Sequence, residues 1–243
     1  MTEITDSRRF KYFDTIFYFI TTYFLYPIFK IYHRAEGAGI RNIPRKGPFI
    51  VIANHACFFD PWYLGVTFRA RYVRCFVTNK WYKKNKLWTF FFDLYGCVPA
   101  TPENMEPSSI KLILKILQYG GAIVIFPEGR VSDDGILQEF KPGAVYIAMK
   151  AKVPIIPVAI CGSHEIMARN ELLPKPSKLK IVVGEAIDVS NIASGKQKMK
   201  DACMRETQKI KDWIAEQLKQ FENRKHSNMR GKDEDRTILM GSR

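Results

Sequence analysis

The chain has 243 residues, 47% of them hydrophobic, so it is long enough for one sizeable α/β domain with a buried core. Its formal net charge of +14 indicates an anionic partner, but charge alone does not decide between nucleic acid, an anionic membrane face and a phosphorylated or phosphopantetheine-carried substrate. The five cysteines are odd in number, scattered and without paired metal-ligand spacing. This argues against a disulfide framework or a zinc module and favours free thiols in a reducing compartment.

Residues 10–32 form a strongly aromatic segment near the start of the chain. Its uncharged core, residues 15–29, falls short of the roughly 20 residues that a spanning helix needs, and it contains Pro27. Aromatic rings with polar tips prefer the headgroup level of a bilayer, so we expect a helix that lies in one leaflet. A spanning helix and a helix packed on the domain are the alternatives. No small-residue cleavage site follows, so residues 1–33 are interpreted as a membrane-associating segment and not as a signal peptide.

The stretch from Phe49 to Trp62 changes from an apolar run into a polar loop. Residues 49–53 are all apolar and follow proline and glycine, which is typical of a strand buried on both faces. Asp60 followed by proline favours a helix start with Asp60 as the N-cap. His55 then lies just past the strand, and across the loop its imidazole is expected to meet the Asp60 carboxylate. Such a pair leaves one ring nitrogen free to take a proton from a substrate hydroxyl.

A second polar loop has the same architecture. The apolar run 122–126 leads straight into Glu128, Gly129 and Arg130. Because ligands in an open parallel sheet bind outside the carboxyl ends of the strands, the two loops are expected to converge at one edge. Without this second loop, a histidine beside a capping aspartate is more simply explained as structural or merely exposed.

The remaining pattern predicts a single α/β domain over residues 34–222, with a mostly parallel central sheet flanked by helices. The run 153–160 contains two prolines, which place it at a strand end or a bulge. From residue 223 the mixed-charge tail is expected to be disordered. Further expected features are a loop or edge strand at 33–48, strands at 72–78 and 179–183, a turn region at 96–107, and helices that begin at Ser108 or Ser109, at Ala144 and at a capping Ser194.

Lysines alternate with aromatic residues between Lys80 and Trp88. This pattern suits a membrane surface or single-stranded nucleic acid. The adjoining apolar block 87–95 favours a membrane or an acyl chain.

Four segments together carry a family resemblance. N-H-A-C-F-F-D at 54–60 resembles the H-x-x-x-x-D motif of the glycerophospholipid acyltransferases, and F-P-E-G at 126–129 resembles their third block. F-K-P-G at 140–143 and V-P-I-I-P-V at 153–158 follow in the family's order, so the similarity covers roughly residues 48–190. It implies an α/β domain on the cytoplasmic face of a membrane. The implied reaction moves a fatty acyl group from coenzyme A or acyl carrier protein to a lysophospholipid hydroxyl, without a metal or redox cofactor.

The resemblance also implies roles for individual residues. His55 corresponds to the general base and Asp60 to the residue that orients its imidazole. Glu128, Gly129 and Arg130 correspond to the acceptor-binding block, in which Arg130 can grip a phosphate with a bidentate fork. Alternatively, Glu128 only braces its loop through backbone N–H groups. A thioester can be attacked directly, so Cys57 is interpreted as a packing residue, with an acyl-enzyme role as the alternative.

One departure from the family concerns the acceptor. The family's second block commonly ends in an arginine that binds the acceptor's phosphate, but the matching position here holds Pro102. Arg130 and Lys80 are the best-placed substitutes. The acceptor is expected to be 1-acylglycerol-3-phosphate, with glycerol 3-phosphate, another lysophospholipid or an amino-acid lipid as alternatives. A non-catalytic basic module that binds membrane or nucleic acid is a remote alternative, and no nucleic-acid partner is expected.

Overall fold

A computed structural model describes residues 9–94, 97–100, 107–167, 173–190 and 196–241 of the chain. Its centre is one sheet in which every described strand pair is parallel except β6 with β7. The prediction of a mostly parallel α/β sheet is therefore confirmed. In spatial order the strands are β1 (Glu36–Ala38), β7 (Lys180–Val183), β6 (Ile155–Cys161), β2 (Phe49–Ala53), β5 (Ala122–Ile125), β3 (Val73–Thr78) and β4 (Val98–Ala100).

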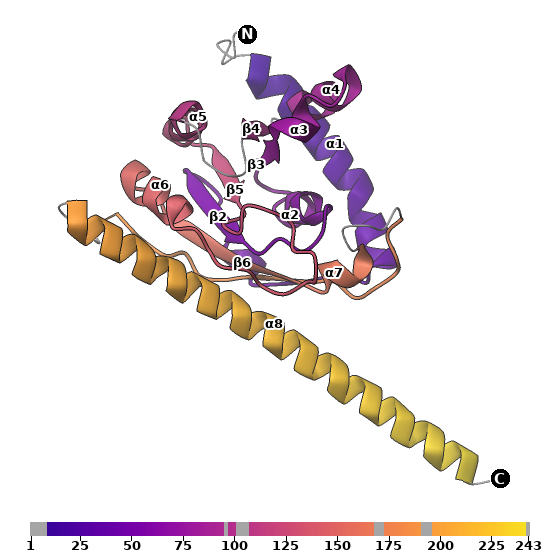
Figure 1. Ribbon diagram of the computed structural model, residues 1–243. Helices are drawn as coiled ribbons and strands as arrows, with labels where there is room; N and C mark the ends of the chain where they lie inside the picture. Colours follow the sequence, from indigo (N-terminus) through magenta and orange to yellow (C-terminus); the bar gives the residue numbers. More distant parts are fainter. Residues whose placement is uncertain (1–8, 95–96, 101–106, 168–172, 191–195, 242–243) are drawn as a thin grey trace.

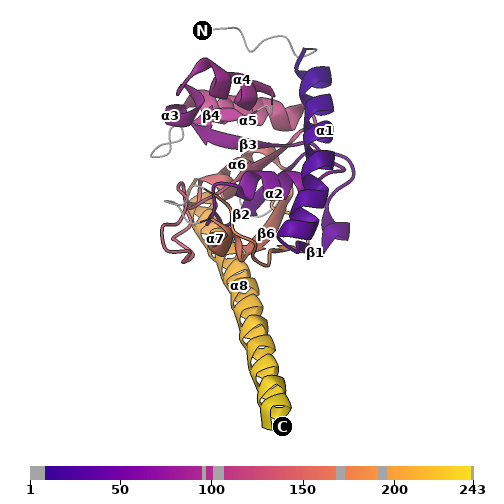
Figure 2. The same cartoon turned by 90° about the vertical axis from the view of Figure 1, so that its right-hand side faces the viewer.

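Helices cover both faces of this sheet (Figures 1 and 2). One face carries α1 (Arg9–Tyr32) and α2 (Asp60–Thr67), which pack on each other, and the other carries α5 (Pro107–Gln118), α6 (Gly143–Ala151) and α8 (Lys196–Gly241). Helices α3 (Asn79–Tyr82) and α4 (Lys86–Leu94) lie by the β3–β4 edge. The 3₁₀ turn η1 (Ile40–Asn42) follows β1, and the short α7 (Ser163–Ile166) follows β6.

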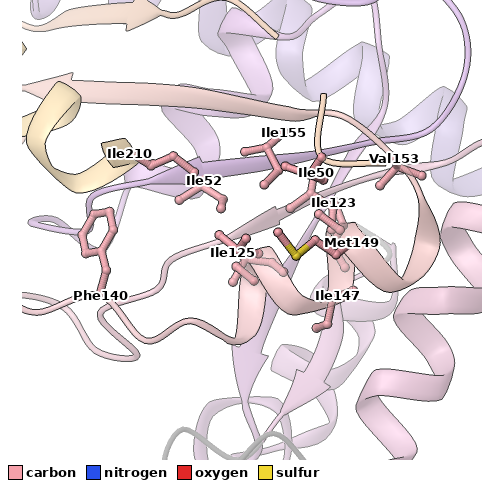
Figure 3. Packing of buried hydrophobic residues seen from close by; sticks show 14 of the residues in the cluster. Ile50, Ile52, Ile123, Ile125, Phe140, Ile147, Met149, Val153, Ile155 and Ile210 are labelled. Atoms are coloured by element: carbon pink, nitrogen blue, oxygen red, sulfur yellow. The ribbon is translucent and has the colours of Figure 1, made fainter. Parts of the chain in front are cut away.

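Strand β2 is the centre of the core, and all five of its residues are buried. Because successive side chains of a strand point to opposite faces, Ile50 and Ile52 pack toward α6 and α8, as Figure 3 shows, while Phe49, Val51 and Ala53 pack toward α2. The continuous apolar run thus serves two cores at once. Burial on both faces is the physical reason why the sequence signal for this strand is strong. The predicted bounds, residues 49–53, are confirmed.

Strand β6 lies in the middle of the sheet, and its pairing with β7 is interrupted at Pro157. Val158 pairs with Val183, but Ile155 pairs with Ile187, so two residues of β6 face three residues of the partner chain. That count defines a β-bulge. The sequence expectation of a strand end or a bulge holds only on this side, where proline has no N–H to give to a continuous ladder and the extra residue lies in the partner segment. On its other side β6 pairs with β2 without a break through Pro157.

Two parts of the fold differ from the sequence expectation. Helix α8 continues to Gly241, whereas a disordered tail was predicted from residue 223. No proline follows Pro176, so nothing interrupts the helix once its first half is packed on the domain, and adding residues to an existing helix is easy. The turn region 96–107 also contains the short strand β4. The capping role predicted for Ser194 lies outside the described residues.

Helix α1 combines a packed end with an exposed apolar surface. Near its carboxyl end, Phe29 is 6% exposed and stacks edge-on against Tyr63 of α2. Tyr23, Phe24 and Ile31 are more than 70% exposed. Among the described helices, none is long and apolar enough to cross a bilayer.

Candidate functional site

The two polar loops lie side by side because their strands do. Strands β2 and β5 pair in parallel with Ile52 opposite Ile125, so both chains leave the sheet at the same edge. The loops are then tied together, since the backbone N–H of Ser132 donates to the carbonyl of His55 over 2.8 Å. The predicted convergence of the two loops is confirmed.

His55 and Asp60 meet in the way that the sequence predicted. His55 Nδ1 lies 2.9 Å from Asp60 Oδ2, with the His55 side chain 15% exposed and that of Asp60 fully buried. Among the described residues, no protein group bonds to the other ring nitrogen, Nε2. A buried carboxylate on Nδ1 favours the tautomer whose Nε2 carries a lone pair, so that nitrogen can accept a proton.

Asp60 does not cap its helix, which corrects one expectation. Helix α2 does begin at Asp60, but no side chain caps it. Instead, Asp60 Oδ2 turns back and accepts the backbone N–H groups of Ala56 and Cys57, each over 2.8 Å. The loop between His55 and Asp60 is thus wrapped around the carboxylate, because five residues are enough to bring these N–H groups to one oxygen.

Cys57 lies inside this wrapped loop. It is 0% exposed, and its sulfur accepts the backbone N–H of Phe59 at 3.4 Å. This burial fits the packing role that was expected for it. All five cysteines are free, as the sequence predicted.

Glu128 braces the two loops. Its Oε1 accepts the backbone N–H of His55 over 2.7 Å and its Oε2 accepts that of Gln138 over 3.1 Å. The side chain is buried, and this burial raises its pKa, an effect that the two backbone hydrogen bonds oppose. Both carboxylate oxygens are therefore engaged within the protein, which is the arrangement expected for the bracing alternative.

Phe126 fixes the plane of the imidazole. Its ring stacks on that of His55 with the centroids 4.1 Å apart and the planes 19° apart. The sequence alone places Phe126 only at the end of a strand. A large aromatic residue directly before the P-E-G turn was the available signal, but its partner depends on the pairing of β2 with β5.

The remaining residues that the sequence singled out are Gly129, Arg130, Lys80 and Pro102. Gly129 turns the loop with φ 75°, a left-handed conformation that glycine adopts without a side-chain clash. Arg130 is exposed and its Nη2 lies 3.5 Å from Gln138 Oε1, so its guanidinium stays largely available. Lys80 begins α3 together with Asn79, but its side chain lies outside the described residues, as does the whole of Pro102.

Asn54 is a structural residue that the sequence analysis did not single out. Its side chain exchanges two hydrogen bonds with the backbone of Ile160, at 2.9 and 2.8 Å, and so ties the end of β2 to β6. It holds the strand end from which His55 projects. Its place directly before the histidine was the only signal in the sequence.

An aromatic chain connects the His55 loop with the lysine-rich segment. Phe58 contacts Trp62 and Trp81, and Trp81 contacts Trp88, with all three pairs of ring centroids between 5.6 and 5.9 Å apart. Lys84 places its ammonium 4.3 Å from the Trp81 ring. An apolar surface with a cationic rim thus begins beside the site.

A cavity of about 230 Å³ lies elsewhere, between α1, α2, β1 and β7. Tyr63, Thr67 and Arg69 of the α2 region line it, but His55, Asp60, Glu128 and Arg130 do not. Because the hydrogen-bonded His55 and Asp60 lie at the edge of the sheet, the candidate site is placed there and not in this cavity. No cluster of three or more metal-ligating side chains occurs within the described parts of the chain.

Comparison with known proteins gives a consistent result. A family model described as Acyltransferase matches residues 34–161, which contain both loops. The chain is 30% identical over 196 residues to the 1-acyl-sn-glycerol-3-phosphate acyltransferase of Bacillus subtilis, covering 80% of this chain and 88% of that protein. It is 33% identical over 136 residues to a probable 1-acyl-sn-glycerol-3-phosphate acyltransferase of Mycoplasma genitalium, covering 54% and 50% of the two chains.

A solved structure shares the fold. The 1-acyl-sn-glycerophosphate acyltransferase PlsC of Thermotoga maritima superposes with a TM-score of 0.59, covering 81% of this chain and 82% of that one. The two sequences are 19% identical, so this likeness concerns the fold alone.

Proposed function

We propose, since the chain belongs to the glycerophospholipid acyltransferase family and is therefore an acyltransferase, that it moves a fatty acyl group from a thioester to the free hydroxyl of 1-acylglycerol-3-phosphate. The product of this reaction is phosphatidic acid. The donor is an acyl group on coenzyme A or acyl carrier protein, and it acts as a co-substrate, so the proposed reaction uses no further cofactor.

The observation that carries this proposal is the pairing of His55 Nδ1 with the buried Asp60 carboxylate at 2.9 Å. An alcohol is a weak nucleophile at neutral pH, and a histidine base accelerates its attack by roughly 10² to 10⁴. In the proposed step, His55 Nε2 takes the hydroxyl proton while the oxygen attacks the thioester carbonyl. The C–S bond of the thioester then breaks, and the imidazolium gives the proton to the departing thiolate, which leaves as the free thiol. Asp60 holds the ring and stabilises its positive charge.

Arg130 is the proposed contact for the acceptor's phosphate. It is exposed, it follows the braced Glu128–Gly129 turn, and a guanidinium matches a phosphate with two parallel hydrogen bonds. Lys80 is a second candidate by its position in the chain. Glu128 is proposed to act on the acceptor only indirectly, by holding the loop that carries Arg130.

A different acceptor is the second candidate, and Pro102 is the observation that favours it. The family's usual phosphate-binding arginine is missing at this position. Glycerol 3-phosphate, another lysophospholipid or an amino-acid lipid would then replace 1-acylglycerol-3-phosphate in the same reaction at His55.

The protein is further proposed to work at a membrane surface, on its cytoplasmic face. The exposed apolar side chains of α1 and the aromatic chain that leads from Phe58 to Trp88 support this placement. Rings and aliphatic side chains exposed on one helix suit the interfacial region of a bilayer. The net charge of +14 favours anionic lipids.

The test is an acyl-transfer assay with purified protein, a panel of lyso-lipids and glycerol 3-phosphate, and both kinds of thioester. We expect the highest kcat/KM with 1-acylglycerol-3-phosphate, and a loss of at least about 100-fold in His55→Ala. His226→Ala, an exposed histidine on α8, is the matched control and should keep full activity. Preference for another acceptor would select the second candidate, and full activity of His55→Ala would disprove the mechanism.

A further inference from the structure

Asp60 presents its two oxygens to very different surroundings. Oδ2 has three partners, His55 Nδ1 and the N–H groups of Ala56 and Cys57. Oδ1 is buried and has no partner among the described residues. A buried carboxylate oxygen without a donor costs considerable free energy, so a buried group or an ordered water is expected to complete it.

A suitable donor lies one helical turn away. Tyr63 follows Asp60 by three residues on α2, which places both side chains on the same side of the helix. Tyr63 is 1% exposed, and its hydroxyl is a second buried polar atom without a partner in the described chain. Two such atoms on one face of one helix turn, one able to donate and the other only to accept, complement each other.

Three aromatic side chains hold Tyr63 in this position. Its ring lies 4.7 Å from that of Phe29 on α1, 5.7 Å from that of His33 just after α1, and 6.4 Å from that of Phe59 in the loop before α2. Burial raises the pKa of the Tyr63 hydroxyl strongly, and the nearby Cys57 and Asp60 raise it further. The hydroxyl therefore keeps its proton and remains a donor.

We propose that Tyr63 is a positioning residue for the catalytic pair: its hydroxyl donates to one buried water, and that water donates to Asp60 Oδ1. A buried water typically makes about three hydrogen bonds to groups that would otherwise lack partners, which fits a site between two such atoms. The carboxylate is then held at both oxygens, so its rotation about the Cβ–Cγ bond is restricted and His55 keeps its orientation. This inference rests on the proposed function of His55 and Asp60.

Tyr63→Phe tests the proposal, because it removes the hydroxyl and leaves the ring in its packing. We expect kcat to fall about 10-fold with KM for both substrates unchanged, since the water that donates to the charged carboxylate loses the hydroxyl that holds it, without any change in contact to substrate. Thr207→Val is the matched control. It removes another buried hydroxyl that has no described partner, on α8, and should leave kcat unchanged.

A purely structural Tyr63 predicts a different result. Removing a buried hydroxyl that has no partner at all would stabilise the protein. A Tyr63→Phe variant with wild-type kcat and a higher melting temperature would overturn the proposal.

Two readouts do not need acyl transfer, so they separate this proposal from the proposed function. The first is the downfield ¹H NMR signal of the His55 Nδ1 proton, identified by its loss in His55→Gln. It should shift or broaden in Tyr63→Phe and remain unchanged in Thr207→Val. The second is a crystal structure, in which a water within hydrogen-bond distance of both Tyr63 Oη and Asp60 Oδ1 supports the proposal. An unaltered NMR signal, or no such water, overturns it even if the enzyme is active.

Discussion

The carboxylate of Glu128 accepts the backbone N–H of His55 over 2.7 Å, so the loop after β5 fixes the chain on which the candidate base is carried. Its second oxygen holds the backbone of Gln138. Glu128 thus joins three segments of chain at the edge of the sheet. We expect Glu128 to affect activity only indirectly, by holding these segments in place.

Glu128→Ala should destabilise the fold by about 2–4 kcal/mol, because two backbone N–H groups lose a charged acceptor in a buried place. Urea unfolding followed by circular dichroism measures this change. Glu185→Ala, which removes an exposed carboxylate just after β7, is the control and should have little effect. A Glu128→Ala variant of normal stability but with a much higher KM for the lyso-lipid would indicate direct acceptor binding instead.

The same carboxyl should make stability depend on pH. Burial raises the pKa of Glu128 above its ordinary value of 4.5. A carboxyl whose pKa is higher in the folded chain than in the unfolded chain contributes fully to stability below its ordinary pKa, and this contribution is lost as pH rises through the raised value. The Glu128→Gln variant has no titratable carboxyl at this position, so it lacks this pH dependence. The stability of wild type minus that of Glu128→Gln should therefore fall as pH rises above 4.5 and then level off, as urea unfolding at a series of pH values will show. A difference that grew with pH would contradict the raised pKa.

The stacking of Phe126 on His55 should matter for turnover. Phe126→Leu keeps an apolar cover but loses the parallel ring contact, and we expect kcat to fall about 3- to 10-fold, in line with the 0.5–1.5 kcal/mol typical of aromatic pairs. Steady-state kinetics measures this. Phe140→Leu makes the same exchange in the core on the other face of the sheet and serves as the control. An equal loss of kcat in both variants would show that general packing is responsible.

Arg130→Ala should raise KM for 1-acylglycerol-3-phosphate about 10- to 100-fold, since a charge-assisted contact with phosphate is lost. Arg130→Lys should recover only part of this loss, because an ammonium has no bidentate fork. The melting temperature should stay unchanged, since the side chain is exposed. The comparison substrate is a monoacylglycerol without phosphate, and an equal rise of KM with it would argue against a phosphate contact.

Membrane binding through α1 is best tested by substitution. Deleting residues 1–33 would remove Phe29 and His33, which are buried against α2, and would damage the domain. Changing Tyr23, Phe24 and Ile31 together to Asp alters only exposed positions and should weaken binding to anionic vesicles at least about 10-fold in a sedimentation assay. Tyr119→Asp, at an equally exposed site after α5, is the control. Unchanged sedimentation of the triple variant would transfer the role to α4 and its neighbours.

The sequence by itself determined the fold class, the central strands and the contact between His55 and Asp60. The apolar runs that became β2 and β5 are buried on both faces, so their sequence signal is continuous and their parallel pairing brings the next residues to one edge. His55 and Asp60 are only five residues apart. Their contact is local, because the short loop between them brings the two side chains together.

Only the tertiary structure decided what surrounds this pair. Glu128 acts as a brace and Phe126 as a stacking partner because of contacts across the sheet. The burial of Asp60 Oδ1 and of the Tyr63 hydroxyl without a partner likewise depends on packing. Local sequence could not reveal them, because a buried carboxylate or ring obtains its role from the atoms that packing brings to it. The same reason explains why Asp60, expected to cap a helix, instead holds the loop of the histidine that it orients.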